Sequence, residues 1–271
     1  MLKVLRKDYD PESKDPKPSQ LIEFAHTQIG TEKHTLQLYE VGDRPLVPFI
    51  RRFKSQKEKV VCLVCVDATK GGQLIETTGW YMKQIREAFG NGGLPSLAEK
   101  RGKNRDSELI QPIPVMTGVV GCKWDLFEKM KSDQKSWTGR GLRYMAHTNS
   151  CSVLSCSSKN SKLGHDFRTS FQTFLLGSDA GMKASKDTAK PIFIQFGEDQ
   201  VDDMKLPTMG NLSGLEALQD ELGRVCGQDK PEKEPEEDVP EIDGAVEEAV
   251  RAKRKVAMLT DRDWQVFCDR A

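Results

Sequence analysis

The stretch PVMTGVVGC, residues 114–122, is an unbroken run of apolar and small residues that ends just before the polar sequence KWD. Runs of this kind suit a strand that is buried on both faces of a sheet. A second run, KVVCLVCVDAT, spans residues 59–69, and a third, CSVLSCSS, spans residues 151–158. We therefore expect three buried strands, with the run at 59–69 in the centre of the sheet.

Helical segments separate these runs. Residues 73–89 place apolar side chains at helical spacing, and residues 165–177 form an amphipathic pattern that Gly177 ends. Another helix is expected to begin at Asp125, and a further one over residues 212–226. Strands that alternate with helices of this length predict βαβ units, a mostly parallel sheet and an α/β fold.

The segments that flank this alternating region differ from it. Residues 20–28 and 31–41 alternate apolar and polar side chains and are expected to form a hairpin-like pair of strands. The apolar segment at 190–199 is expected to be extended. Residues 227–243 are rich in Glu, Asp and Pro, which predicts a solvated linker.

Composition excludes several classes of protein. The 271 residues carry 41 Lys and Arg against 41 Asp and Glu, and this balance argues against a nucleic-acid binder. No apolar run approaches the ~20 residues of a membrane span, and residues 1–13 lack the apolar stretch of a signal peptide. The seven cysteines are odd in number and scattered, which fits a reducing compartment. We expect a cytosolic protein with one domain and an extension.

The strongest local motif is the sequence that follows the strand at 114–122. A buried strand that ends in x-K-x-D is where Ras-like GTPases recognise guanine, and Lys123 and Asp125 occupy those places. Cys122 stands where such proteins usually carry Asn or Thr. The loop Ser157, Ser158 and Lys159 resembles the S-A-K loop after the final strand of such folds. The alternative interpretation is an exposed charged pair after a strand.

Other parts of a GTPase site are missing from the sequence. Gly42 would be the γ-phosphate-sensing glycine of a D-x-x-G motif, but Tyr39 stands in place of its Asp, and Glu40 faces the other side of the strand. The phosphate-binding sequence G-x-x-x-x-G-K-[ST] does not occur in the chain. We therefore expect vestigial nucleotide binding at most, with no catalytic residue, no cofactor and no metal.

The pair Cys62 and Cys65 has the spacing of metal or redox motifs. Residues three apart on a strand point to opposite faces, so we interpret these cysteines as buried, inert thiols. His147 lies in a helix-to-strand connection, and we interpret it as a capping or packing residue.

Several blocks of sequence together resemble one family, the light intermediate chains of cytoplasmic dynein-2. They are PKPSQLIEF (16–24), LQLYEVG (36–42), DSELIQPIPVMTGVVGCKWDLF (106–127), LRYMAHTNSCSVLSCSSK (142–159), KPIFIQFG (190–197) and AVEEAVRAKR (245–254). The resemblance implies a Ras-like fold of the P-loop NTPase type that serves as a non-catalytic scaffold on the dynein heavy-chain tail. It further implies other dynein-2 subunits as partners, an indirect association with microtubules and intraflagellar transport trains, and a location in the cytoplasm, cytoskeleton, cilium or flagellum, and basal body.

Members of this family usually begin with a strand and a P-loop-like sequence. Residues 1–8 of this chain resemble the end of the helix after that loop, so we expect an N-terminally incomplete sheet, through a start codon assigned too late or a truncation. The expected organisation is a Ras-like domain without its first strand and P-loop (1–205), a helical segment (206–226), the acidic linker (227–243) and a C-terminal amphipathic helix (244–271).

The C-terminal helix is the expected docking element. Val246, Val250, Ala257, Trp264 and Phe267 would form its apolar face, although the helix could instead pack on its own domain. The sequence is also compatible with two alternatives to the motor subunit. One is a small Ras-like GTPase whose P-loop was lost from the gene prediction, and the other is a pseudo-GTPase adaptor outside dynein.

Overall fold

The computed structural model divides the chain into two compact units, residues 1–229 and residues 230–271. It describes residues 2–5, 10, 12, 22–29, 34–42, 44–55, 60–90, 105–176, 185–188, 190–206 and 214–227, all in the first unit. Residues 228–243 of the predicted linker and the whole predicted C-terminal helix lie outside the described residues, as do the five docking residues expected on that helix.

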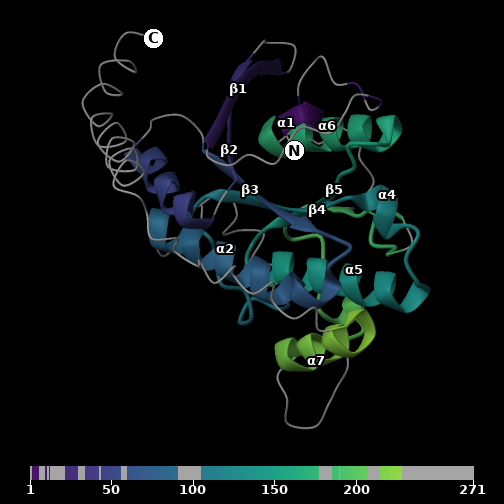
Figure 1. Cartoon of the computed structure of the whole chain (residues 1–271). Coiled ribbons are helices and arrows are strands. Elements are labelled where there is room, and N and C mark those ends of the chain that lie inside the picture. Colours follow the sequence, from purple (N-terminus) through teal and green to yellow (C-terminus); the bar gives the residue numbers. More distant parts are fainter. Residues whose placement is uncertain are drawn as a thin grey trace, which may run out of the picture. The chain divides into compact units, whose positions relative to one another are not determined.

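The first unit contains two separate sheets (Figure 1). The smaller sheet is the antiparallel hairpin of β1 (Ile22–Ile29) and β2 (His34–Val41), which confirms the predicted hairpin. The larger sheet has the order β3-β4-β5-β6, made of β3 (Val61–Asp67), β4 (Met116–Cys122), β5 (Ser152–Ser155) and β6 (Phe193–Ile194). Strands β3, β4 and β5 are parallel, and β6 pairs antiparallel with β5.

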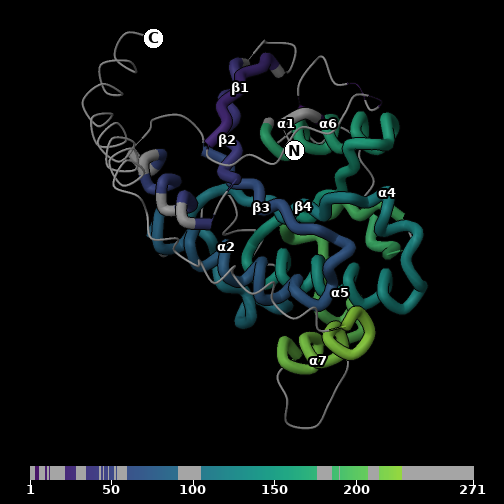
Figure 2. Tube along the Cα trace, viewed as in Figure 1, coloured from purple at the N-terminus to yellow at the C-terminus, as the bar shows by residue number. Residues whose placement is uncertain are grey.

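Helices lie on both faces of the larger sheet, as the path of the chain shows (Figure 2). They are α1 (Leu2–Leu5), α2 (Leu74–Phe89), α4 (Trp124–Phe127), α5 (Ser132–Thr148), α6 (Ser161–Leu176) and α7 (Gly214–Cys226). Three 3₁₀ helices complete the described elements: η1 (Arg44–Ser55), η2 (Gly71–Gln73) and η3 (Asp202–Met204).

The core consists of two apolar clusters. One contains Val119 of β4 with residues of α2, α5 and α7, and the other contains Val120 with α1, β2 and α6. Adjacent strand residues face opposite sides, so a strand such as β4 contributes to both clusters. Burial at this position explains why β4 carries no charged side chain and why the hydroxyl of its Thr117 donates to the carbonyl oxygen of Val115.

Two sequence predictions need correction, and a third is confirmed in part. The run at 59–69 was expected in the centre of the sheet, but β3 is an edge strand of the described sheet. The expectation failed because an apolar pattern indicates that a strand is buried and does not indicate which strands lie beside it. The segment at 190–199, expected to be extended or strand-like, contains the two-residue strand β6, which confirms that prediction in part. The helix expected from Asp125 onward is divided into α4 and α5.

Close helix packing gives a test of this arrangement. A Cβ at Gly141 in α5 would lie 2.7 Å from Cδ2 of Leu74 in α2 and 3.2 Å from Cδ1 of Leu222 in α7. We expect Gly141→Val to lower the free energy of unfolding by about 1–3 kcal/mol through overpacking, measured by urea denaturation.

Gly79, in α2, provides the matched control. A Cβ there meets only Cε of Met145, at 3.8 Å, so Gly79→Ala should raise stability by up to about 1 kcal/mol through helix propensity. Equal stabilities of the two variants would contradict the described packing of α5 against α2 and α7.

Candidate functional site

The candidate site lies where three parallel strands end. Asp67 closes β3, Lys123 follows β4 directly, and Ser157 follows β5 by two residues. The carboxyl ends of parallel strands meet at one edge of a sheet, which is where α/β folds bind ligands. The ladder pairs Asp67 with Cys122, so the side chains of Asp67 and Lys123 come from neighbouring strand ends.

Lys123 turns the chain from β4 into α4 and pairs with Asp67. Its φ of 57° places it in the left-handed region, which costs a residue with a Cβ about 1 kcal/mol or more. The Nζ atom of Lys123 lies 2.6 Å from Oδ2 of Asp67. The other carboxylate oxygen of Asp67 accepts hydrogen bonds from the backbone N–H of Thr69 (3.0 Å) and from its hydroxyl (2.6 Å).

These contacts set the ionisation of Asp67. Burial by itself would raise the pKa of the Asp67 carboxyl, but hydrogen bonds from Lys123 and Thr69 together outweigh burial and hold that pKa below its ordinary value. The same hydrogen bond raises the pKa of Lys123. Both groups are therefore charged at neutral pH and are paired with each other.

Asp125 lies in α4 and contacts the loop after β5. Its Oδ1 accepts a hydrogen bond from the Ser157 hydroxyl. The backbone N–H of Lys159 donates to Oγ of Ser157 at 3.1 Å, and the N–H of Trp124 donates to the carbonyl oxygen of Cys156 at 3.1 Å. These bonds join the K-x-D segment to the S-S-K loop.

Two aromatic side chains anchor the short helix α4 beneath this contact. Trp124 and Phe127 are fully buried, with their ring centroids 4.4 Å apart. Their burial holds the first turn of α4 against the core, so that Asp125 projects from a fixed backbone.

The structure thus brings together most of the residues predicted from the sequence. Lys123, Asp125 and the loop of Ser157, Ser158 and Lys159 gather at the strand ends. Gly42 follows β2 in the other sheet, and no hydrogen bond or ion pair between described residues joins it to this cluster.

Sequence reasoning missed Asp67 and Thr69. The signal was the sequence VDAT at the end of the apolar run at 59–69, because a polar residue that ends a parallel strand lies at the ligand-binding edge. In this structure Asp67 forms an ion pair with Lys123, one of the residues that the sequence motif singled out.

The predicted burial of the two thiols on β3 is wrong for Cys65, whereas the raised pKa of both thiols agrees with the predicted inertness. Cys62 is half-buried, and burial raises the pKa of its thiol to about 12, whereas Cys65 is exposed. A hydrogen bond between Cys65 and Cys122 raises the pKa of Cys65 and lowers that of Cys122.

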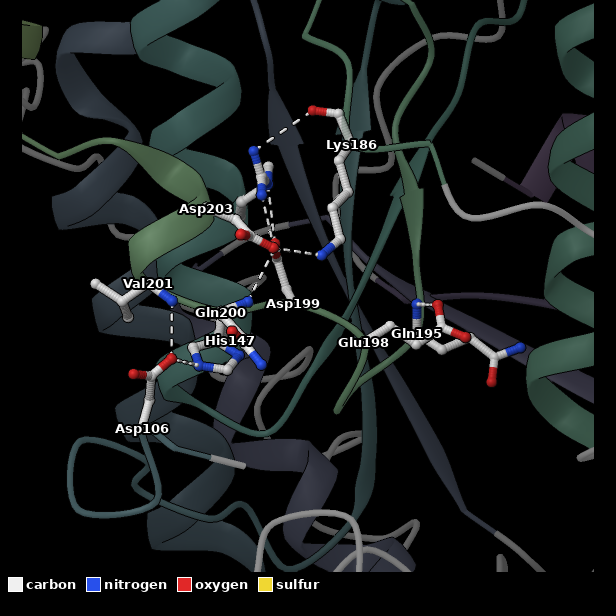
Figure 3. A network of polar contacts seen from close by, with 10 residues as sticks. Asp106, His147, Lys186, Gln195, Glu198, Asp199, Gln200, Val201 and Asp203 are labelled. Atoms are coloured by element: carbon white, nitrogen blue, oxygen red, sulfur yellow. Dashed lines mark hydrogen bonds and ion pairs between the residues drawn. The ribbon is translucent and has the colours of Figure 1, made fainter. Parts of the chain in front are cut away.

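A second polar cluster connects α5 to the segment around β6 (Figure 3). Arg143 donates two hydrogen bonds to Asp199, from Nε at 2.8 Å and from Nη2 at 2.6 Å, and both side chains are only 5% exposed. Nζ of Lys186 lies 3.6 Å from the same carboxylate and 2.8 Å from Oδ2 of Asp203. A buried ion pair of this kind depends on full hydrogen bonding of both partners.

His147 joins the same region from the last turn of α5. Its Nε2 lies 3.0 Å from Oδ2 of Asp106, which also accepts the backbone N–H of Val201 at 2.7 Å (Figure 3). The histidine is buried, which agrees with the packing role predicted for it. These contacts fasten the chain after β6 to α5, on the side of the sheet that α2 also covers.

Two features were sought among the described residues, a metal site and a membrane-spanning helix. Among them, no group of three or more His, Cys, Asp or Glu side chains is arranged to hold a metal ion. None of the described helices is both long and apolar enough to span a membrane.

The fold and the cluster at its strand ends define an α/β protein of the Ras-like type. A crystal structure of the conserved domain of a dynein light intermediate chain is similar to it, with a TM-score of 0.51 and 11% identity over 86% of this chain and 87% of that chain. This likeness supports the predicted fold class.

The sequence is similar to cytoplasmic dynein 2 light intermediate chain 1. The identity is 30% over 102 residues with the protein of Danio rerio and 27% over 134 residues with that of Homo sapiens. These matches cover 38% and 46% of this chain but only 28% and 38% of the two relatives. No family model matches the chain. The predicted resemblance to dynein-2 light intermediate chains is confirmed.

Acid titration tests the pair of Asp67 and Lys123. The pKa of Asp67 is lower in the folded state, so its ionised form stabilises the fold above the unfolded pKa of about 4, and that contribution is lost as pH falls through the folded pKa. We expect Asp67→Asn to be less stable than the wild type at pH 7 and the difference to shrink at pH 3, measured by urea denaturation.

Lys123→Met is the matched variant from the other side of the pair. It removes the ammonium group while retaining most of the side-chain stem, and its stability difference from the wild type should shrink over the same acid range. A difference of the same size at pH 7 and pH 3 for both variants would contradict the pairing.

The buried pair of Arg143 and Asp199 gives a larger expected effect. Arg143→Ala leaves a buried carboxylate without its main partner and should cost about 3–5 kcal/mol of unfolding free energy. The exposed pair of Lys83 and Glu87 in α2 is the control, since Lys83→Ala should cost less than about 1 kcal/mol. Equal losses from the two substitutions, measured in urea, would rule out a structural role for the buried pair.

Proposed function

We propose that this chain is a non-catalytic light intermediate chain subunit of the cytoplasmic dynein-2 motor. In this role it would stabilise the heavy chain for retrograde intraflagellar transport and cilium assembly. The proposal places the protein in the cytoplasm and cytoskeleton, at the basal body and in the cilium or flagellum.

The main support for this proposal is that the polar side chains at the strand ends are bonded to one another. Lys123 is paired with Asp67, and Oδ1 of Asp125 is engaged by Ser157, so two groups that would read a base are bonded to the protein itself. The sequence also lacks the glycine-rich loop, Lys and Ser or Thr that would hold the phosphates. Together with the similarity to dynein-2 light intermediate chains, this supports a scaffold rather than an enzyme.

In this proposal two parts of the chain each make a separate contact with the heavy chain. The Ras-like domain (1–205), proposed to lack its first strand and P-loop, would bind the heavy-chain tail, with the helical segment (206–226) beside it. The acidic linker (227–243) would tether the C-terminal helix (244–271) as a second contact. Two weak contacts on one tether raise occupancy through effective concentration.

Co-purification from ciliated cells tests the proposal. The tagged full chain should recover dynein-2 heavy chain, and deletion of residues 227–271 should weaken that recovery. In the full chain, Trp264→Ser with Phe267→Ser should weaken it in the same direction, whereas Leu215→Ser, at an exposed leucine of α7, should not. Absence of every dynein component from the wild-type sample would refute the proposal.

The second candidate is a Ras-like GTPase whose P-loop is missing from the predicted gene product. The position of Lys123, Asp125 and the loop of Ser157 at the carboxyl ends of parallel strands favours it, because α/β folds bind ligands at that edge. An in-frame G-x-x-x-x-G-K-[ST] upstream of Met1, with GTP turnover by the extended protein that Asp125→Asn abolishes, would support this candidate. If the extended protein does not hydrolyse GTP, the dynein-2 scaffold and an adaptor outside dynein remain as candidates. Recovery of dynein-2 heavy chain in the co-purification distinguishes between them.

A further inference from the structure

Aromatic side chains form a continuous row across β1, β2 and η1. The ring centroids of Phe49 and Phe53 in η1 are 5.8 Å apart, and Phe53 lies 4.8 Å from Tyr39 of β2. The ring of Tyr39 lies 5.0 Å from that of Phe24 in β1, which in turn lies 6.3 Å from His26. These distances fall within the range of interacting aromatic pairs. We call these five side chains the aromatic face.

The aromatic face reaches the surface at Phe24. The rings of Tyr39, Phe49 and Phe53 are half-buried, whereas Phe24 is 55% exposed. Among the described residues it is the most exposed of the large apolar side chains. The neighbouring rings restrict its movement before any partner binds, so that little conformational entropy remains to be lost on binding. Aromatic side chains held in this way are frequent at the centre of protein–protein interfaces.

The hairpin buries its other face within the domain. Phe24 lies opposite Tyr39 in the ladder and Ala25 lies opposite Leu38, so the two pairs point to opposite faces. The face of Ala25 and Leu38 packs against α1 and α6 in the second apolar cluster. Packing on that side fixes the hairpin to the domain, which leaves the aromatic face directed away from α6.

The charges beside the aromatic face are mainly positive. The sequence of η1, RPLVPFIRRFKS, contains Arg and Lys but no Asp or Glu. Arg44 and Arg51 of η1 are exposed, and Arg51 lies 3.9 Å from a carboxylate oxygen of Glu87 in α2. In the hairpin, Glu23 and Glu40 lie opposite each other on the face of Ala25, not on the aromatic face. A complementary partner therefore carries apolar side chains next to carboxylates.

We propose that the aromatic face is the surface of the Ras-like domain that binds the dynein-2 heavy chain, through a heavy-chain segment that presents apolar side chains beside carboxylates. This inference rests on the proposed function, because it takes its partner from the similarity to dynein-2 light intermediate chains. Phe24 supplies the central apolar contact, and the arginines of η1 supply the surrounding charge.

Charge also argues against a second copy of this chain as the occupant. A twofold contact places the same patch of both copies face to face. The arginines of η1 in one copy would then approach those of the other, and like charges in an interface disfavour association.

Photo-crosslinking in ciliated cells tests the proposal. The tagged full chain carries Phe24→p-benzoylphenylalanine, which retains an aromatic ring at the exposed position. The control chain carries Leu109→p-benzoylphenylalanine, at a leucine that is 51% exposed in the segment before β4. Irradiation should join the dynein-2 heavy chain to position 24 and not to position 109.

Three further variants test the chemistry of the contact in the full chain. Phe24→Glu removes the ring and repels carboxylates, so it should reduce recovery of heavy chain by on the order of tenfold. Phe24→Trp retains an aromatic side chain and should recover as much as the wild type. Leu109→Glu adds the same charge elsewhere and should leave recovery unchanged. Thermal melts of all three report whether the fold is retained.

The outcomes separate this inference from the proposed function. If the wild-type chain recovers heavy chain, and Phe24→Glu recovers as much with no cross-link at position 24, this inference is wrong and the proposed function stands. If the wild-type chain recovers no heavy chain, both are wrong. A cross-link from position 24 to a second copy of this chain, or only to other proteins, would also overturn the inference.

Discussion

The hydrogen-bonded ladders on both sides of β4 are the constraint on which the remaining structure depends. A strand buried on both faces has no water to satisfy its N–H and C=O groups, so neighbouring strands must do so. Pairing with β3 and β5 meets this requirement and sets all three strands parallel. The same pairing divides the core into two clusters and brings three strand ends to one edge.

The cluster at that edge serves the protein itself. In a nucleotide-binding protein of this fold, a Lys and an Asp after the equivalent strand face a base. Here Asp67 holds the ammonium of Lys123, and Ser157 donates to Asp125, so these side chains brace three loops against one another. These contacts join the ends of β3, β4 and β5 within the domain.

Local patterns predicted much of this architecture and little of its long-range pairing. The apolar run of β4, the helical spacing of α2 and the alternation in the hairpin could be read because each depends on residues close in sequence. Asp67 with Lys123, and Arg143 with Asp199, are each 56 residues apart, and no local pattern joins them. The edge position of β3 was missed because a buried strand looks the same whether one or two strands flank it.

The buried ion pair of Arg143 and Asp199 affects how the domain unfolds. Detachment of the segment around β6 alone would leave the guanidinium of Arg143 inside the protein without the carboxylate that balances its charge. Opening of that segment is therefore coupled to the loss of α5, although β6 itself is only two residues long. A peripheral strand thus belongs to the same cooperative unit as the core helix beneath it.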